Sequence, residues 1–175
     1  FSAWTASELA AIGIYEITFD DSKKKDEQWY INTNQTFTYD TDAGTVTATY
    51  GNATAKAHAD TLFTEQDETD GKGTEGEVAT RGLKYKLIQA VKAEAKGLLN
   101  QTDWYITRKA EKNTAIPSAI TTWRDGIRTK QAAMETLITN ASNTPALETL
   151  YTYVNTADEG DPRVLERPLG ELPRL

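Results

Sequence analysis

Residues 100–128 read NQTDWYITRKAEKNTAIPSAITTWRDGIR and combine two tryptophans, a proline and several basic side chains. The residue before Pro117 disfavours helical backbone, so the stretch predicts a break between two helices. Thr102 or Asp103 can cap a short helix before the break, and Pro117 or Ser118 can begin a long helix after it. We therefore predict that this stretch is the corner between two packed helices.

On both sides of the corner, apolar residues recur at three- and four-residue steps, as on one face of an amphipathic helix. The long helix after the corner is expected to end near Asn140, and Asn143 or Thr144 can cap a last helix with Pro145 as its first residue. Residues 80–157 are thus predicted to form a helical hairpin or small bundle. The predicted apolar faces contain Leu83, Leu87, Ala90, Val91, Ala95, Leu98 and Leu99 before the corner, and Ile120, Trp123, Ile127, Met134, Leu137 and Ile138 after it.

The aromatic and basic residues of the corner admit two interpretations. Aromatic rings beside basic side chains can form a groove for a polyanion such as single-stranded nucleic acid. Trp123, however, shares a helical stripe with Ile120 and Ile127, which predicts that it faces the core. Trp104 lies one turn before Arg108 and can bury its ring at the corner. The helical spacing therefore favours a structural corner.

The basic residues after the proline fit the same interpretation. Arg124 and Arg128 are expected to flank the apolar stripe on its outside, where Asp125 and Glu135 are near enough to pair with them. The candidate structural or interaction corner then consists of Trp104, Tyr105, Arg108, Trp123, Arg124, Ile127 and Arg128.

Residues 1–63 are predicted to form a small α+β domain. Thr5 and Glu8 have capping-box spacing, and Gly13 can end the short helix that they begin. Three segments, IYEITF, QWYIN and QTFTYDTDAGTVTATYG, alternate as strands do, and Gly44 suits the turn within the last one. We expect an antiparallel sheet of three or four strands covered by the first helix. Such a sheet is marginal alone and needs a partner surface.

Two segments outside these elements differ in composition from the rest. Residues 64–79 are acidic and rich in glycine and contain almost no apolar side chains. They cannot offset their ordering entropy by burial, so we predict a flexible linker with the domain boundary near residue 70. Residues 158–175 repeat apolar residues between prolines, which predicts an extended tail that docks on another surface.

The charge and composition of the chain exclude several functions. The net charge is −7, and residues 1–78 carry 15 acidic and 5 basic side chains, against 11 and 14 in residues 79–175. An acidic front half argues against nucleic-acid binding, which needs a basic face. The chain has no cysteine and no apolar run long enough to span a bilayer. We expect no nucleic-acid or membrane partner.

No catalytic or metal-binding pattern stands out. His58 is the only histidine, and no serine lies in a G-x-S-x-G context. The segment DETDGKG fails the register of a calcium loop, since Thr69 and Gly71 occupy positions that need oxygen donors. The aspartate pairs lie in predicted turns, where aspartate is favoured for local hydrogen bonding. We expect no enzyme activity, cofactor or metal.

Two parts of the sequence resemble a family of small tail proteins of tailed bacteriophages. The corner fits the pattern LLxxTDWYxxRKAExxxxIPxxxxxWRxxIR, and the front, WTASELAAIGIYEITFDD, is similar to the WTAEELxAIGVYxVT segment of such proteins. The resemblance covers roughly residues 3–20 and 83–140. Its matching corner residues are Leu98, Leu99, Thr102, Asp103, Trp104, Tyr105, Arg108, Lys109, Ala110, Glu111, Ile116, Pro117, Trp123, Arg124, Ile127 and Arg128.

The resemblance implies a small N-terminal α+β unit followed by a helical hairpin, with no catalytic residue. It implies a virion structural protein of the tail, acting as a fibre or baseplate adaptor through protein–protein contacts. The alternative is a tail-fibre assembly chaperone that is not retained in the particle. The expected partners are other tail subunits and further copies of the chain, and the expected location is the virion tail after synthesis in the host cytoplasm.

Overall fold

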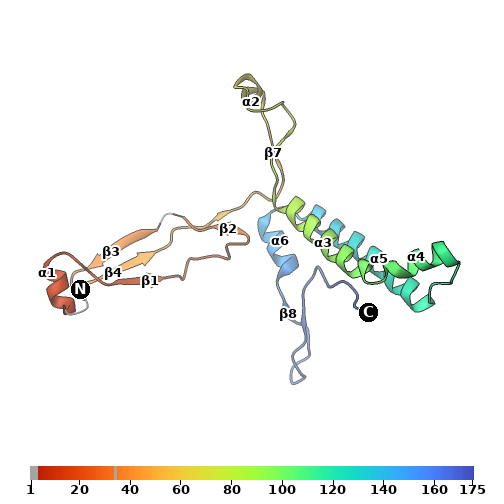
Figure 1. Ribbon diagram of the computed structural model, residues 1–175. Coiled ribbons are helices and arrows are strands. Elements are labelled where there is room, and N and C mark those ends of the chain that lie inside the picture. Colours follow the sequence, from red (N-terminus) through yellow and green to blue (C-terminus); the bar gives the residue numbers. More distant parts are fainter. Residues whose placement is uncertain (1–3, 34) are drawn as a thin grey trace. The chain divides into compact units, whose positions relative to one another are not determined.

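The computed structural model describes residues 4–33 and 35–175 (Figure 1). It contains both α-helices and small β-sheets, which confirms the α+β class. The chain divides into two compact units, Phe1–Lys56 and Ala57–Leu175, called here the sheet unit and the helical unit.

The division after Lys56 differs from the boundary expected near residue 70. The backbone N–H groups of Leu83 and Lys84, at the start of the first long helix, each donate to a carbonyl at 2.9 Å, that of Ala57 and that of His58. The residues after Lys56 therefore belong with the helices, and composition alone did not reveal this hydrogen bonding.

The sheet unit begins with α1 (Ala6–Ala11). Thr5 and Glu8 form the predicted capping box, and Gly13 has a φ of 79° just after the helix, as its place in the sequence predicted. The predicted hairpin is also confirmed, with Gly44 at a φ of 63° in its turn. The strands of the unit are β1 (Ile17–Asp20), β2 (Tyr30–Ile31), β3 (Thr36–Asp40), β4 (Thr45–Thr49) and β5 (Thr54–Ala55).

The main sheet has the strand order β1-β4-β3. β3 and β4 are antiparallel, whereas β1 and β4 are parallel, so the prediction of a wholly antiparallel sheet is wrong. Strand β2 does not join this sheet but pairs with β5. Residue alternation indicates which side chains share a face, but it carries no information on the direction or neighbour of a strand.

The helical unit contains the helices that the sequence predicted after residue 80. Thr102 and Pro117 are the N-cap residues of the second and third of them, and Asn143 caps the last, with Pro145 in its first turn. These boundaries agree with the sequence prediction. The helices are α3 (Leu83–Asn100), α4 (Asp103–Lys112), α5 (Ser118–Asn140) and α6 (Thr144–Tyr151).

Helices α3 and α5 lie side by side and antiparallel (Figure 1). At one end, Lys84 Nζ donates to the Thr139 carbonyl at 2.8 Å, and at the other, Arg124 Nη1 donates to the Leu99 carbonyl at 2.8 Å. The core between and around them consists of Leu83, Val91, Ala95, Ile120, Trp123, Ile127, Met134, Ile138, Ala141, Leu147, Leu169 and Leu172.

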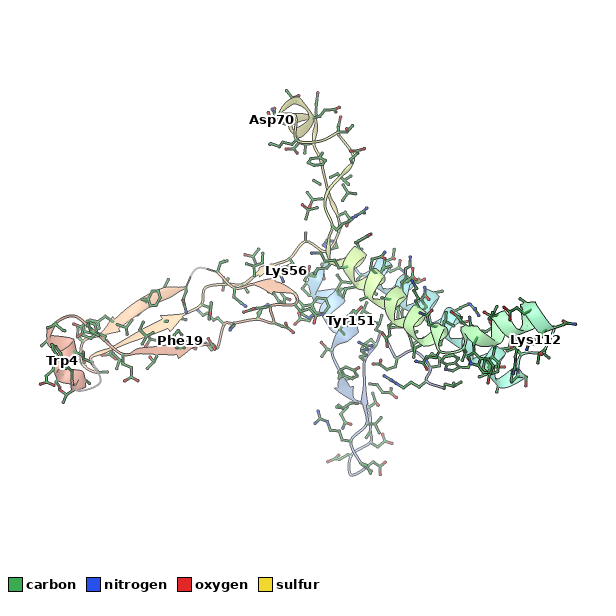
Figure 2. The ribbon with its side chains drawn as sticks, viewed as in Figure 1. Trp4, Phe19, Lys56, Asp70, Lys112 and Tyr151 are labelled. Carbon is green, nitrogen blue, oxygen red and sulfur yellow. The ribbon has the colours of Figure 1, made fainter. Side chains whose placement is uncertain are left out.

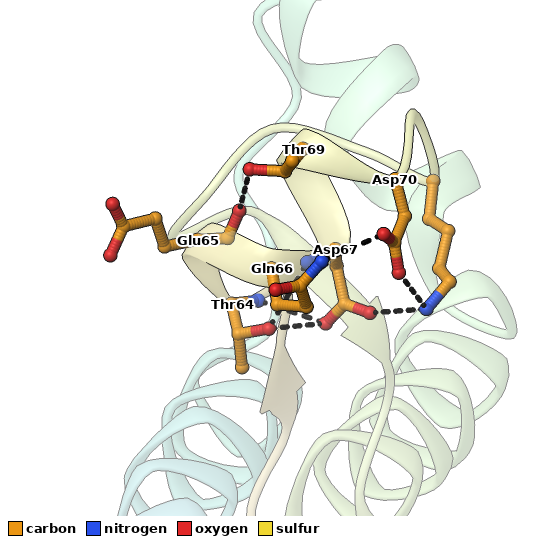
Figure 3. A network of polar contacts seen from close by, with 7 residues as sticks. Thr64, Glu65, Gln66, Asp67, Thr69 and Asp70 are labelled. Carbon is orange, nitrogen blue, oxygen red and sulfur yellow. Dashed lines mark hydrogen bonds and ion pairs between the residues drawn. The ribbon is translucent and has the colours of Figure 1, made fainter.

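The segment predicted as a linker carries secondary structure. Strand β6 (Thr61–Leu62) pairs with β7 (Val78–Thr80), and α2 (Glu65–Thr69) lies between them. Thr64 and Asp67 form a capping box, and Lys72 Nζ lies 3.0 Å from a carboxylate oxygen of both Asp67 and Asp70 (Figure 3). The arm formed by residues 61–80 is thus ordered by local polar contacts, together with the close packing of the Phe63 ring over Gly73.

The C-terminal tail folds back on the helical unit of its own chain. Its first part is not simply extended, because β9 (Leu165–Glu166) forms a hairpin with β8 (Val154–Asn155). Further on, the Leu169 N–H donates to the Leu150 carbonyl at 3.0 Å, and Leu169 and Leu172 are buried. The apolar residues between the prolines thus dock within this chain, whereas the sequence had left the docking surface open.

Candidate functional site

The corner between α3, α4 and α5 is held by one buried cation. Arg124 is 7% exposed, and its Nη1 donates to the Leu99 carbonyl at 2.8 Å and to Thr102 Oγ1 at 2.7 Å. Its Nη2 donates to Asp103 Oδ1 at 2.8 Å. The Leu99 carbonyl at the end of α3 also accepts hydrogen bonds from the Thr102 backbone N–H and from Thr102 Oγ1, at 3.1 Å each, so the guanidinium adds a further donor to this turn.

This geometry corrects the expectation that Arg124 flanks the apolar stripe on its outside. The helical period places Arg124 beside Trp123, and the polar turn at Thr102 and Asp103 provides acceptors on that side of α5. Thr102 and Asp103 were expected only as helix caps, and their role as acceptors for Arg124 was missed. The only sequence signal for this role was that a threonine and an aspartate follow the apolar face of α3 by about one turn.

Trp123 and Ile127 form the apolar part of the same corner. Ile127 is fully buried and Trp123 is 8% exposed, as the helical stripe predicted. The indole Nε1 of Trp123 donates to the Pro173 carbonyl at 3.1 Å, so the tail completes the environment of this ring. Buried indole N–H groups need such a partner.

Trp104 does not bury its ring and is 50% exposed, which contradicts the prediction. Helix α4, which ends at Lys112 (Figure 2), contributes no buried residue, so the ring has no core to enter. The Trp104 and Tyr105 ring centroids are 3.8 Å apart, and the Arg108 guanidinium lies 4.7 Å from the Trp104 ring centroid and 5.2 Å from that of Tyr105. The three side chains cover one another on the helix surface.

The remaining basic residue of the corner pairs as expected. Arg128 Nη1 lies 2.9 Å from Asp125 Oδ1, and both side chains are exposed. Glu135 instead lies 3.3 Å from Lys92 Nζ and accepts a hydrogen bond from Gln131. Exposed pairs of this kind contribute little to stability, so Arg128 is a surface residue with a local partner.

The corner therefore has a buried half and an exposed half. The buried half, Trp123, Arg124 and Ile127, ties the helices together. The exposed half consists of Trp104, which is half exposed, and of Tyr105 and Arg108, which are partly buried against it, and these are the three residue types most enriched at protein–protein contact hot spots. The arrangement can support adhesion to another protein through aromatic and cation–π contacts.

Within residues 4–33 and 35–175, no three His, Cys, Asp or Glu side chains gather so that they could hold a metal ion. Across the same residues, no helix is both long and apolar enough to cross a bilayer.

Comparison with known proteins found no match among family models, curated protein sequences or solved structures. The resemblance to small phage tail proteins therefore rests on the residues quoted for it, at the front of the chain and at the corner.

Proposed function

We propose that the chain is a structural protein of a bacteriophage tail, an adaptor in the fibre or baseplate that works through protein–protein contacts. The choice of a phage tail rests on the sequence resemblance at the front and at the corner. The choice of a contact protein is supported by one structural observation, the amount of surface that the chain leaves uncovered.

The exposed surface is large for a chain of this length. The whole chain exposes 11973 Å². Two separate compact proteins with the lengths of the sheet unit and the helical unit would together expose about 10,000 Å². The excess of roughly 2,000 Å² is comparable to what subunits of permanent complexes bury between them. This surplus supports a protein that is completed by contacts with other subunits.

Large apolar side chains contribute to that surface in both units. Phe19 and Phe37 are 68% and 60% exposed in the sheet unit, and Trp104 is half exposed at the corner of the helical unit. Isolated soluble proteins rarely expose large apolar patches. In the proposed adaptor, the small N-terminal β unit and the C-terminal helical hairpin are the two contact modules.

The tail is not a contact module in this proposal. Leu169 and Leu172 are buried within the helical unit, and the Pro173 carbonyl accepts the Trp123 indole N–H. The segment RPLGELPRL therefore serves the stability of the chain itself, and the proposed contacts with other tail subunits fall on the exposed faces.

Peptide mass spectrometry on gradient-purified phage particles and on the cleared lysate tests the proposal. Peptides from this chain should appear in the particles at a fixed ratio to other tail proteins. Peptides confined to the lysate would contradict the adaptor and favour the tail-fibre assembly chaperone, which covers an immature fibre and then leaves. A phage with the gene deleted serves as the control for carry-over, and its tails should lack fibres or baseplate parts.

A further inference from the structure

The β1-β4-β3 sheet has two chemically different faces. Residues paired across neighbouring strands point to the same side of a sheet, and successive residues of a strand point to opposite sides. The register forms two rows on one face, Ile17–Val46–Tyr39 and Phe19–Ala48–Phe37. All six of these residues are apolar or aromatic.

The opposite face is polar throughout. Thr18 and Thr47 lie next to each other there, with their Oγ1 atoms 3.2 Å apart, and Thr36 Oγ1 lies 3.5 Å from the Thr49 carbonyl. This face carries Thr18, Asp20, Thr36, Thr38, Asp40, Thr45, Thr47 and Thr49. Because apolar and polar residues alternate strictly, one face suits exposure to water and the other suits burial against another surface.

The apolar face is nevertheless largely uncovered. Phe19 (Figure 2) and Phe37 are more than half exposed, and Ile17 and Tyr39 are 45% and 46% exposed. Only Ala48, between the two phenylalanines, is fully buried. A single three-stranded sheet has no second layer of its own to form a core, and stable domains need two packed layers.

We propose that the apolar face binds the same face of a second copy of this chain, so that two sheets form a sandwich. This inference deepens the proposed function and rests on it for the assembly in which the pair takes part. A two-fold axis parallel to β4 places Phe19 of one copy opposite Phe37 of the other, and Ala48 opposite Ala48. Aromatic pairs then close both flanks of the contact, at the spacing of about 10 Å between packed sheets.

The charges favour a second copy over a charged partner. The chain has a net charge of −7, so two copies repel each other at most surfaces. The apolar face has no charged side chain in either row, and like copies can therefore meet there without opposing carboxylates. A strongly basic partner would find no acidic group within the rows to pair with.

The area of the face limits the size of the contact. With about 200 Å² for each fully exposed large side chain, the four exposed residues offer roughly 400 Å² per copy. A standard interface buries about 800 Å² per partner, so we expect a small contact and a weak, reversible pair.

Sedimentation velocity on the full chain, from about 1 to 200 μM, tests the pairing at the concentrations where a weak dimer forms. A dimer should form, and Phe37→Lys should weaken it at least about 100-fold because a charge would be buried. Thr38→Lys, on the next residue of β3 and the polar face, is the matched control and should leave the dimer intact. Phe37→Thr keeps a strand-forming residue and should also weaken the dimer. This second variant shows that the loss does not come from misfolding of the lysine variant.

Chemical crosslinking locates the contact independently. The chain has no cysteine, so each introduced thiol is unique. Val46→Cys lies close to the proposed axis and should crosslink to its counterpart with a bismaleimide. Thr47→Cys, the next residue on the opposite face, should not.

Several outcomes would overturn the inference. A chain that stays monomeric throughout the concentration series contradicts it, as does a dimer that Phe37→Lys and Thr38→Lys affect equally. A closed trimer contradicts the two-fold pairing. The proposed function is tested separately, since a monomeric chain found in particles would refute only the pairing, and a dimer absent from particles would refute only the adaptor.

Discussion

The helical unit closes its apolar surface with its own chain, whereas the sheet unit leaves its apolar face uncovered. In the helical unit, α3, α6 and the tail surround the stripe of α5, and Ile127, Ile138 and Leu169 are fully buried. In the sheet unit, Phe19 and Phe37 stay mostly exposed on a single layer. Both units show clear apolar patterning, so patterning alone does not decide whether a core forms within one chain.

The difference follows from the number of layers that each unit can supply. The helical unit has two long helices of similar length and a tail that returns to them, which provides several surfaces to pack. A buried apolar side chain contributes roughly 1.5–3 kcal/mol relative to an exposed one. Substitutions should therefore have large effects in the helical unit and small effects in an isolated sheet unit.

The largest effect is expected at Trp123. Trp123→Ala should lower the free energy of unfolding by about 3–5 kcal/mol, because it removes a buried ring and its hydrogen bond to the Pro173 carbonyl. Trp104→Ala at the exposed half of the corner, and Phe37→Ala in the sheet unit of the monomeric chain, should each cost less than about 1 kcal/mol. Urea unfolding followed by circular dichroism measures all three. Equal losses at Trp123 and Phe37 would contradict the difference in packing between the two units.

The tail provides the next test. Leu169→Ala should destabilise the helical unit by about 2–4 kcal/mol, since Leu169 is fully buried and its removal leaves a cavity. Leu175→Ala is the matched control, because Leu175 is 71% exposed and its truncation should change the stability by less than about 0.5 kcal/mol. Thermal unfolding compares the two variants. If the Leu169 variant unfolds like the parent chain, the tail does not close the core.

Arg124 tests the polar part of the helical core. Arg124→Lys should cost about 1.5–3 kcal/mol, because an ammonium group cannot reach the Leu99 carbonyl, Thr102 and Asp103 together as the guanidinium does. Arg128→Lys changes an exposed pair with Asp125 and should stay within about 0.5 kcal/mol. Chemical denaturation of both variants provides the measurement. If Arg124→Lys leaves the free energy of unfolding unchanged, the position needs only a positive charge.

The smallest effect concerns the arm that contains α2. Hydrogen bonds from the Thr64 backbone and side chain, and then from Lys72, lower the pKa of Asp67 from 3.8 to about 2. Because the folded pKa is depressed, the contribution of this carboxylate to the order of the arm is complete above about pH 4. It is lost as the pH falls towards 2.

Carboxyl NMR titration of Asp67, together with amide exchange across α2, measures this transition. The arm should loosen between pH 4 and 2 while the α3–α5 core keeps its protection. Asp67→Asn removes this titrating group, so its arm should show a smaller transition, to which Asp70 still contributes because Lys72 and Gln66 lower its pKa. An Asp67 carboxyl that titrates near 3.8 would mean that the capping box does not form.

Much of the secondary structure could be predicted from the sequence, because its signals lie within a few residues of one another. The capping box of Thr5 and Glu8, the turn at Gly44 and the break at Pro117 depend on local backbone geometry. The buried positions of α5 followed from helical spacing, although Leu137 of the same stripe is 39% exposed. Burial also depends on what packs opposite, and spacing does not supply that.

Local sequence signals were enough to predict α1 and α3 to α6, most of their ends and the alternation of the main strands, since these depend on neighbouring residues. Long-range packing accounts for the rest: Arg124 is buried and Trp104 exposed, β1 runs parallel to β4, and the tail covers Trp123. Each of these facts depends on a partner far away in the chain. The acceptors that a guanidinium meets, or the surface that a ring meets, exist only once distant segments have come together.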